Sequence, residues 1–297
     1  MRRLSIMTHS LKHASLIHKL LLLIMLLYVG GCASLASHGL TQGIANSIQN
    51  QSDLTIVETG MPAYLLMVDG MIMNTPHDAT LLMAGSRLYS AYAGVFATDE
   101  AHARMHAGKA YRYAEQAVCR KLSKLCSEEA RDFERFAELV DGVRGREGAE
   151  LLYTYATAWA SWIQVNSGEW HYLADLPRVE ILLKRVIALD DDFEQGMPHV
   201  YLGIINAQLP PTLGGRPEVG REHFEHAIEL SQGRNLIAKV EYARTYARLL
   251  FERELHDRLL KEVLVADPEE EGLTLANVVA QKQARILLEE SGEYFEE

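Results

Sequence analysis

Several histidines in this chain have the spacing that a shared metal ion requires. His102 and His106 are four positions apart on a predicted helix, so both imidazoles would lie on one face. No third ligand stands near them, and Ala103 and Ala107 indicate a closely packed helix with a solvated histidine edge. We therefore expect no metal site here.

The stretch from residue 190 to residue 226 also lacks a complete ligand pattern. His223 and His226 are three apart, but no Glu-x-x-His pair is present, which excludes the pattern of di-iron bundles. The acids at 190–192 could begin a calcium loop, yet Gly196 is one place late for an EF-hand and Tyr201 occupies position twelve. The sequence predicts a polar helix face and a solvated turn, with no bound metal.

Motifs for catalysis are missing. The chain contains no HExxH zinc motif, no GxSxG nucleophile motif and no phosphate-binding P-loop. We therefore expect a protein that is not an enzyme, with no catalytic residues and no cofactor.

Two sets of aromatic residues could line a ligand cavity. Such cavities are mostly apolar, with few polar groups. The same spacing is also typical of a packed helical core, and both interpretations stay open. If a ligand tunnel exists, we expect these helices to line it. The first set is Tyr64, Tyr89 and Tyr92; the second is Tyr155, Trp159 and Trp162.

Helices must position these groups along nearly the whole chain. Apolar residues recur on one helical face, as at Leu81, Gly85, Leu88 and Tyr92, and no sustained alternation indicates a strand. The eight prolines fit helix edges, with Pro62 expected to open a helix. The sequence predicts an all-α fold of about 10–12 helices. The better predicted ranges are 61–74, 78–96, 100–122, 127–140, 148–166, 176–190, 197–209, 217–231, 236–250, 255–266 and 273–291.

A degenerate repeat indicates stacked helical hairpins. Residues 197–231 fit a tetratricopeptide (TPR) unit, with Leu202-Gly203 in the first helix and Gly220, Phe224 and Ala227 in the second. Small residues at such positions let two helices approach closely, and the aromatic ring fills the groove between pairs.

The N-terminus has the features of a lipoprotein signal. A basic region precedes an apolar run that starts at Leu20 and ends in Gly30-Gly31-Cys32, which resembles a bacterial lipobox. An ordinary cleaved signal peptide is the alternative, and translation could start at Met1 or Met7. We expect a signal peptide at 1–31, a lipid-anchored polar segment at 32–52 with the lipid on Cys32, and a TPR-like domain at 53–297.

The charge and the cysteines restrict the partners and the compartment. Removal of residues 1–31 leaves 25 basic and 40 acidic side chains, which argues against nucleic acid as a partner. Cys119 and Cys126, with six residues between them, could form a disulfide in an oxidising compartment or stay reduced in a helical region.

Several stretches resemble the T component of TRAP transporters, a family of periplasmic TPR-like lipoproteins. They are residues 61–66 with Asp69-Gly70, residues 88–94, the 212–217 segment with 222–230 after it, and residues 235–248. In the 212–217 segment, two glycines permit a sharp reversal and a proline starts the next helix. This loop consists of Thr212 followed by the motif residues Leu213, Gly214, Gly215, Arg216 and Pro217.

The resemblance implies stacked TPR-like hairpins, a homotrimer, a hydrophobic cavity in each subunit and a periplasmic solute-binding protein as partner. It implies an accessory role in the uptake of an apolar or organic-acid ligand. Separately, Ala33 and Ser34 follow Cys32 with no acid there, which by the usual lipoprotein sorting pattern indicates the outer membrane, facing the periplasm. The alternative is a general envelope scaffold whose TPR groove binds extended segments of other proteins.

Overall fold

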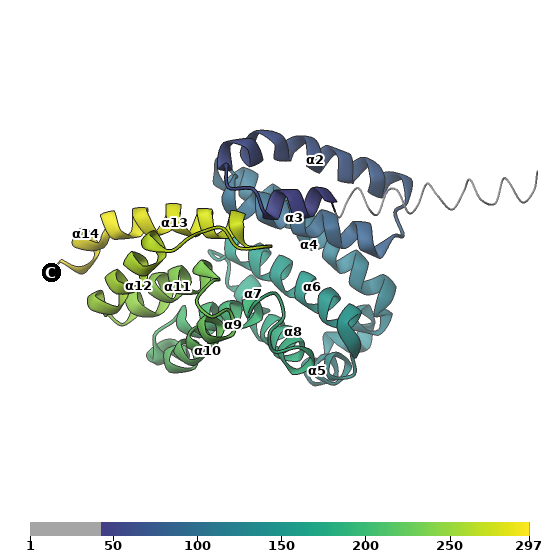
Figure 1. Ribbon diagram of the computed structural model, residues 1–297. Helices are drawn as coiled ribbons and strands as arrows, with labels where there is room; N and C mark the ends of the chain where they lie inside the picture. The colour runs from purple at the N-terminus through teal and green to yellow at the C-terminus, as the bar shows by residue number, and fades with distance from the viewer. Residues whose placement is uncertain (1–42, 297) are drawn as a thin grey trace, which may run out of the picture. The chain divides into compact units, whose positions relative to one another are not determined.

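The computed structural model describes residues 43–296, so the predicted signal peptide and Cys32 lie outside the described residues. The chain divides into two compact units, residues 1–50 and 51–297. In the first unit, the described residues 43–49 form a helix. The second unit is also helical, and the described part of the chain contains no strand. The predicted all-α fold is confirmed (Figure 1).

Helices of the second unit follow one another through short connections. A 3₁₀ turn at Pro211–Leu213 precedes α10, and a π-helical turn at Ala243–Ala247 continues α11. The α-helices are α2 (Leu54–Asn74), α3 (Ala79–Val95), α4 (Glu100–Lys121), α5 (Phe133–Asp141), α6 (Gly145–Val165), α7 (Trp170–Leu173), α8 (Leu176–Leu189), α9 (Met197–Ala207), α10 (Pro217–Leu230), α11 (Leu236–Tyr242), α12 (Arg253–Val265), α13 (Thr274–Glu289) and α14 (Ser291–Phe295).

Aspartates and prolines define where many of these helices begin. The side chains of Asp53, Asp78, Asp99 and Asp132 accept hydrogen bonds from backbone N–H groups in the first turns of α2, α3, α4 and α5. Such capping satisfies N–H groups that have no partner within the helix. Prolines stand in the first turns of α8, α9 and α10, where a missing N–H costs nothing.

The prediction that Pro62 opens a helix is wrong. Helix α2 begins at Leu54, so Pro62 lies in its interior. A proline there costs about 3 kcal/mol, because a backbone hydrogen bond is lost. The first two turns bury Val57 and Met61, and full burial of each side chain contributes about 1.5–3 kcal/mol. Burial therefore compensates for the interior proline.

Neighbouring helices pack as hairpins (Figure 1). Helix α3 packs on α4, α4 on α6, α6 on α8, and α9 on α10, while α11, α12 and α13 pack together near the C-terminus. The seam of α4 consists of alanines with no exposed surface: Ala107, Ala110, Ala114 and Ala117. Small side chains there let α3 and α6 approach α4 from two sides.

Helix α2 is long and apolar enough to cross a membrane, judged by length and composition. A helix of a folded domain can pass the same test. One face of α2 is buried, with Val57, Leu65 and Val68 inside, and the helix packs against α3. On the opposite side Leu66 and Met73 are exposed.

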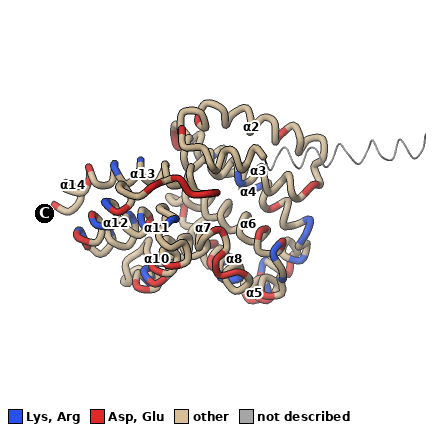
Figure 2. The backbone as a smooth tube through the Cα atoms, viewed as in Figure 1, with Lys and Arg blue, Asp and Glu red and all other residues tan. Residues whose placement is uncertain are grey.

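Charged residues are spread over the helices, as Figure 2 shows. An acidic run lies in the connection between α12 and α13, where Asp267, Glu269, Glu270 and Glu271 follow closely. Nε of Arg234 pairs with Oε1 of Glu270 at 3.1 Å, which links this connection to the residues before α11.

Candidate functional site

The loop at residues 212–217 connects α9 to α10 and has a closely defined backbone. Gly214 has a φ of 87°, in the left-handed region that favours glycine. A Cβ atom on Gly215 would lie 1.7 Å from the carbonyl oxygen of Leu209, so no other residue fits without a shift of the backbone. The N–H of Arg216 donates to the carbonyl of Asn206 at 2.9 Å. Both glycines are therefore required by the shape of the loop.

Side chains fasten this loop to α8 and α10. Nη2 of Arg216 donates to both carboxylate oxygens of Glu180, at 2.7 and 2.8 Å, and Pro217 is buried at the start of α10. Burial would raise the pKa of Glu180, but hydrogen bonds from Lys184 and Arg216 outweigh it and hold the pKa below its usual value. The loop thus presents Leu213, whose side chain is 68 % exposed, from a fixed base.

The first aromatic set lies where α3 faces α2 and α4. The hydroxyl of Tyr89 donates to Asp69 at 2.7 Å, and the ring of Tyr92 meets that of His106 at 4.8 Å, edge to face. Tyr89 is buried, whereas Tyr64 and Tyr92 are half-buried. Tyr89 and Tyr92 therefore lie in the same region of the fold, which also contains a charged pair.

That charged pair is Asp69 of α2 and Lys109 of α4. Nζ of Lys109 bonds Oδ2 of Asp69 and lies 4.5 Å from the ring centre of Tyr89, while the hydroxyl of Tyr113 donates to Oδ1 of Asp69 at 2.7 Å. Burial would raise the pKa of Asp69, but the bonds from Lys109, Tyr89 and Tyr113 hold it below its usual value. Burial, with the bond to Asp69, raises the pKa of Tyr113 to about 12.

Sequence reasoning did not identify this pair. Its members lie 40 positions apart, and only the packing of α2, α3 and α4 brings them together. The one available signal was that Asp69 lies within a stretch shared with the family that the sequence resembles.

The second aromatic set lies on α6 and packs on the other flank of α4. Tyr155 and Trp159 are each 7 % exposed and meet Tyr111 of α4, with ring centres 5.9 and 5.8 Å apart respectively. Trp162 packs close to Gly108, where an added Cβ would lie 2.9 Å from its ring. The two predicted sets therefore contact different residues of α4, while α3 and α6 also contact each other. Their role as a cavity lining stays a prediction.

Cys119 and Cys126 form a disulfide in the structure, with their Cα atoms 5.4 Å apart. The bond joins the last turn of α4 to the 3₁₀ turn at Ser123–Cys126. It therefore fixes the sharp change of direction after α4.

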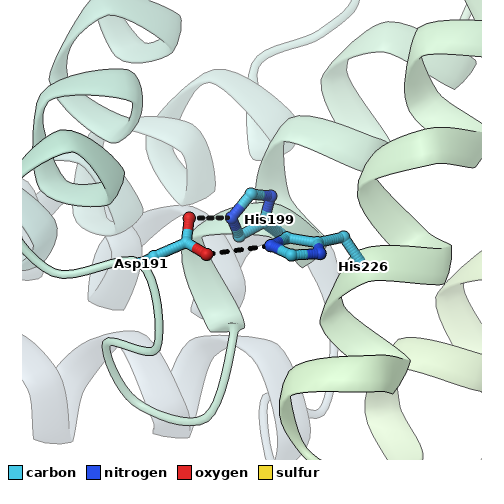
Figure 3. A group of neighbouring side chains, drawn as sticks. All are labelled: Asp191, His199 and His226. Carbon is cyan, nitrogen blue, oxygen red and sulfur yellow. Dashed lines mark hydrogen bonds and ion pairs between the residues drawn. The ribbon is translucent and has the colours of Figure 1, made fainter.

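Four polar residues meet at the end of the α9–α10 hairpin that is opposite the 212–217 loop. Nε2 of His199 lies 3.1 Å from Oδ1 of Asp191, and Nε2 of His226 lies 2.9 Å from Oδ2 of the same carboxylate (Figure 3). Nδ1 of His199 lies 2.9 Å from Nδ1 of His223. Burial lowers the pKa of His223 to about 4 and that of His199 below its usual value.

The sequence predicts a solvated turn around Asp191 and a polar helix face around His226, and it gives no signal for His199. The structure brings all three together, in a group whose ligand atoms lie within 4.8 Å of one another. By contrast, His102 pairs with Asp99 at 2.7 Å on the exposed side of α4.

An open groove of about 980 Å³ lies beside α10, α11 and α12. Charged side chains of both signs line it, together with two aromatic rings, and it contains none of the six aromatic residues predicted above. Its lining includes Arg221, Glu225, Tyr242, Phe251 and Arg258.

Stacked hairpins with small residues in their seams place the protein in the class of TPR-like helical proteins. The family model of the TRAP transporter T-component matches residues 50–295. The chain therefore belongs to the TRAP transporter T-component family, an accessory family of transporters, and this membership implies a location in the cell envelope. A search of curated proteins finds no match.

Proposed function

We propose that the protein is a periplasmic, lipid-anchored accessory of a TRAP-type uptake system that docks the solute-binding protein and binds or channels its ligand. The observation that carries the proposal is the family match, which extends over residues 50–295 and so includes nearly the whole helical unit. Transfer of a ligand without chemical change needs no catalytic group, in agreement with the missing catalytic motifs.

The 212–217 loop supports the docking of a partner protein. Its backbone is held by Gly214, Gly215 and the Arg216–Glu180 pair, yet Leu213 projects with 68 % of its surface exposed. Leu209, before the loop, and Val219, after it, are also exposed apolar residues. A fixed apolar contact loses little conformational entropy on binding, which favours affinity.

The aromatic sets on the two flanks of α4 support a ligand that is apolar or an organic acid. Tyr92 offers half-buried ring surface, and the ammonium of Lys109, which is bonded to Asp69, lies beside Tyr89. An apolar ligand, or the apolar body of an organic acid, matches aromatic ring surface of this kind. The carboxylate of an organic acid would have to replace Asp69 as the partner of Lys109. We assign Tyr64, Tyr89, Tyr92, Tyr155, Trp159 and Trp162 as the residues that line the ligand path.

Lipid on Cys32 would hold the protein at the periplasmic face of the outer membrane. Two or more acyl chains give stable anchoring, whereas a single chain gives reversible binding. We propose a homotrimer as the functional assembly, following the family resemblance.

Native mass spectrometry of the mature chain with its purified solute-binding protein tests the proposal. We expect a trimer that gains the mass of the binding protein, and of a ligand when ligand is supplied. A strictly monomeric protein that never associates with the binding protein would contradict the proposal.

A second function has one observation in its favour. The open groove beside α10, α11 and α12 is lined by charges of both signs, as a groove for extended peptide segments would be. A general envelope scaffold would then bind polar peptides in this groove. Substitution of Arg258 by Glu would weaken that binding and leave the association with the solute-binding protein unchanged.

A further inference from the structure

The His–Asp group at the end of the α9–α10 hairpin has the composition of a metal site. Asp191 lies in the turn after α8, His199 in the first turn of α9, and His226 in α10, and Figure 3 shows all three side chains converging. The carboxylate lies between the two imidazoles, 3.1 Å from Nε2 of His199 and 2.9 Å from Nε2 of His226.

These distances are close to those that a bound zinc ion imposes. Zinc bonds to imidazole nitrogen and carboxylate oxygen are about 2.0–2.2 Å long, so adjacent ligand atoms in a tetrahedral site are about 3.3 Å apart. The three ligand atoms already lie within 4.8 Å of one another. A small rearrangement of the side chains would therefore admit the ion.

The surroundings of the ligands agree with this assignment. Metal-bound histidines usually have the second ring nitrogen hydrogen-bonded, which fixes the ring. Nδ1 of His199 has such a partner in Nδ1 of His223 at 2.9 Å. Nδ1 of His226 lies 3.7 Å from Oε2 of Glu229, an ion-pair distance.

The exposed fractions of the three ligand side chains fit a metal site with one open coordination position. The side chain of His199 is 7 % exposed, whereas those of Asp191 and His226 are 52 % and 39 % exposed. One side of the group is therefore closed by protein. The other side faces solvent, from which the ion and a fourth ligand, a water molecule, can enter.

We propose that Asp191, His199 and His226 bind one zinc ion. Two imidazoles and a carboxylate suit zinc, whereas magnesium and calcium prefer ligand sets made of oxygen atoms. Neither the 212–217 loop nor the aromatic sets are part of this site, so the proposal is independent of the transport role.

Zinc would stabilise the turn between α8 and α9. Glu194, Gln195 and Gly196 have φ angles of 49°, 53° and 79°, an unfavourable conformation for the first two. Asp191 begins this turn, so a metal that joins it to His199 and His226 would hold the turn against α9 and α10.

Isothermal titration with Zn²⁺ alone tests the proposal. The sample is the mature chain without a polyhistidine tag, freed of metal by dialysis against a chelator. We expect binding of one ion per chain and a higher Tm with Zn²⁺ but not with Mg²⁺. Co²⁺ in place of Zn²⁺ should give the visible absorption of a tetrahedral site.

Variants at the exposed ligands show whether the ion binds here. His226→Ala and Asp191→Asn should each weaken Zn²⁺ binding by at least about 10–100-fold. Changes to residues that only support the metal ligands already cause losses of this size. His102→Ala is the matched control, because His102 also pairs with an aspartate on the surface. The proposal is overturned if the wild type binds no Zn²⁺ at 100-fold excess, or if the two ligand variants bind it as tightly as the control. The three side chains would then form a hydrogen-bonded cluster without a metal ion.

Discussion

The ring of Phe224 in α10 occupies the space that a side chain on Gly203 in α9 would need. A Cβ atom on Gly203 would lie 2.7 Å from the ring, and Phe224 has no exposed surface. Gly220 continues the same contact, since its Cβ would lie 2.9 Å from the carbonyl oxygen of Gly203. Close approach of α9 and α10 therefore depends on two residues without side chains.

Gly203→Ala should destabilise the fold. The added methyl group forces Phe224 out of a fully packed position, and overpacking of this kind costs about 1–3 kcal/mol. Urea unfolding followed by circular dichroism gives the free energy of unfolding. Gly94→Ala in α3 is the control, because nothing lies within 4 Å of its Cβ position, and it should stabilise by about 0.5–1 kcal/mol. Equal stability of the two variants would contradict this packing.

Asp69→Asn should destabilise the protein by about 1.5–3 kcal/mol at neutral pH, the range for a hydrogen bond to a charged group. The bonds from Lys109, Tyr89 and Tyr113 hold the pKa of Asp69 below its usual value, despite burial. The stabilisation is therefore complete above the unfolded pKa of about 3.9 and is lost as pH falls through the folded value. Unfolding free energies at several pH values should show the wild type and the variant converging below pH about 3.9.

A control for this variant is Asp141→Asn. Asp141 pairs with Arg185 at 3.0 Å, but its side chain is 76 % exposed. An exposed pair contributes about 0–1 kcal/mol. If Asp69→Asn lost no more stability than Asp141→Asn, or if its loss did not change with pH, the cluster would not have the energetic role assigned to it.

The packing of hairpins could be predicted from sequence because local signals encode it. Leu202-Gly203, Gly220 and Phe224 occupy TPR positions, and the structure places Gly203, Gly220 and Phe224 in one contact region between α9 and α10. Helix α7 was not predicted, because four residues show no periodicity. The range predicted for α2 begins at residue 61, because a proline is typical of a first helical turn. The helix begins at Leu54 instead, where the side chain of Asp53 caps it.

The polar clusters could not be predicted, because their members are distant in sequence. Asp69 and Lys109 lie 40 positions apart in the sequence, and Asp191 and His226 lie 35 positions apart. Each residue alone has the features of a solvated side chain. Only the positions of the helices on which they lie decide which polar groups meet.

Reduction of the Cys119–Cys126 disulfide should lower the stability by about 2–3 kcal/mol, because the bond restricts a short loop in the unfolded chain. The Cys119→Ser, Cys126→Ser double variant should show the same loss without a reducing agent. Alkylation followed by mass spectrometry should find no free thiol at these two positions in protein secreted to the periplasm. Full alkylation before reduction would show that the bond is not formed there.

Cys32→Ser should release the protein from the membrane fraction. Without the cysteine no acyl chain is attached, and the mature chain carries a net negative charge that does not favour anionic lipid. Immunoblots of soluble and sedimented envelope fractions measure the change. A variant that sediments as completely as the wild type would show that something other than lipid holds the protein.

Surface plasmon resonance between the mature protein and its purified solute-binding protein tests the central claim most directly. The account predicts saturable binding, weakened by about tenfold or more in Leu213→Asp, since a charge replaces the exposed apolar contact of the loop. Val265→Asp is the control: it changes another exposed aliphatic residue, at the end of α12, and should leave the Kd unchanged. No measurable binding by the wild type, or equal affinity in both variants, would contradict the account.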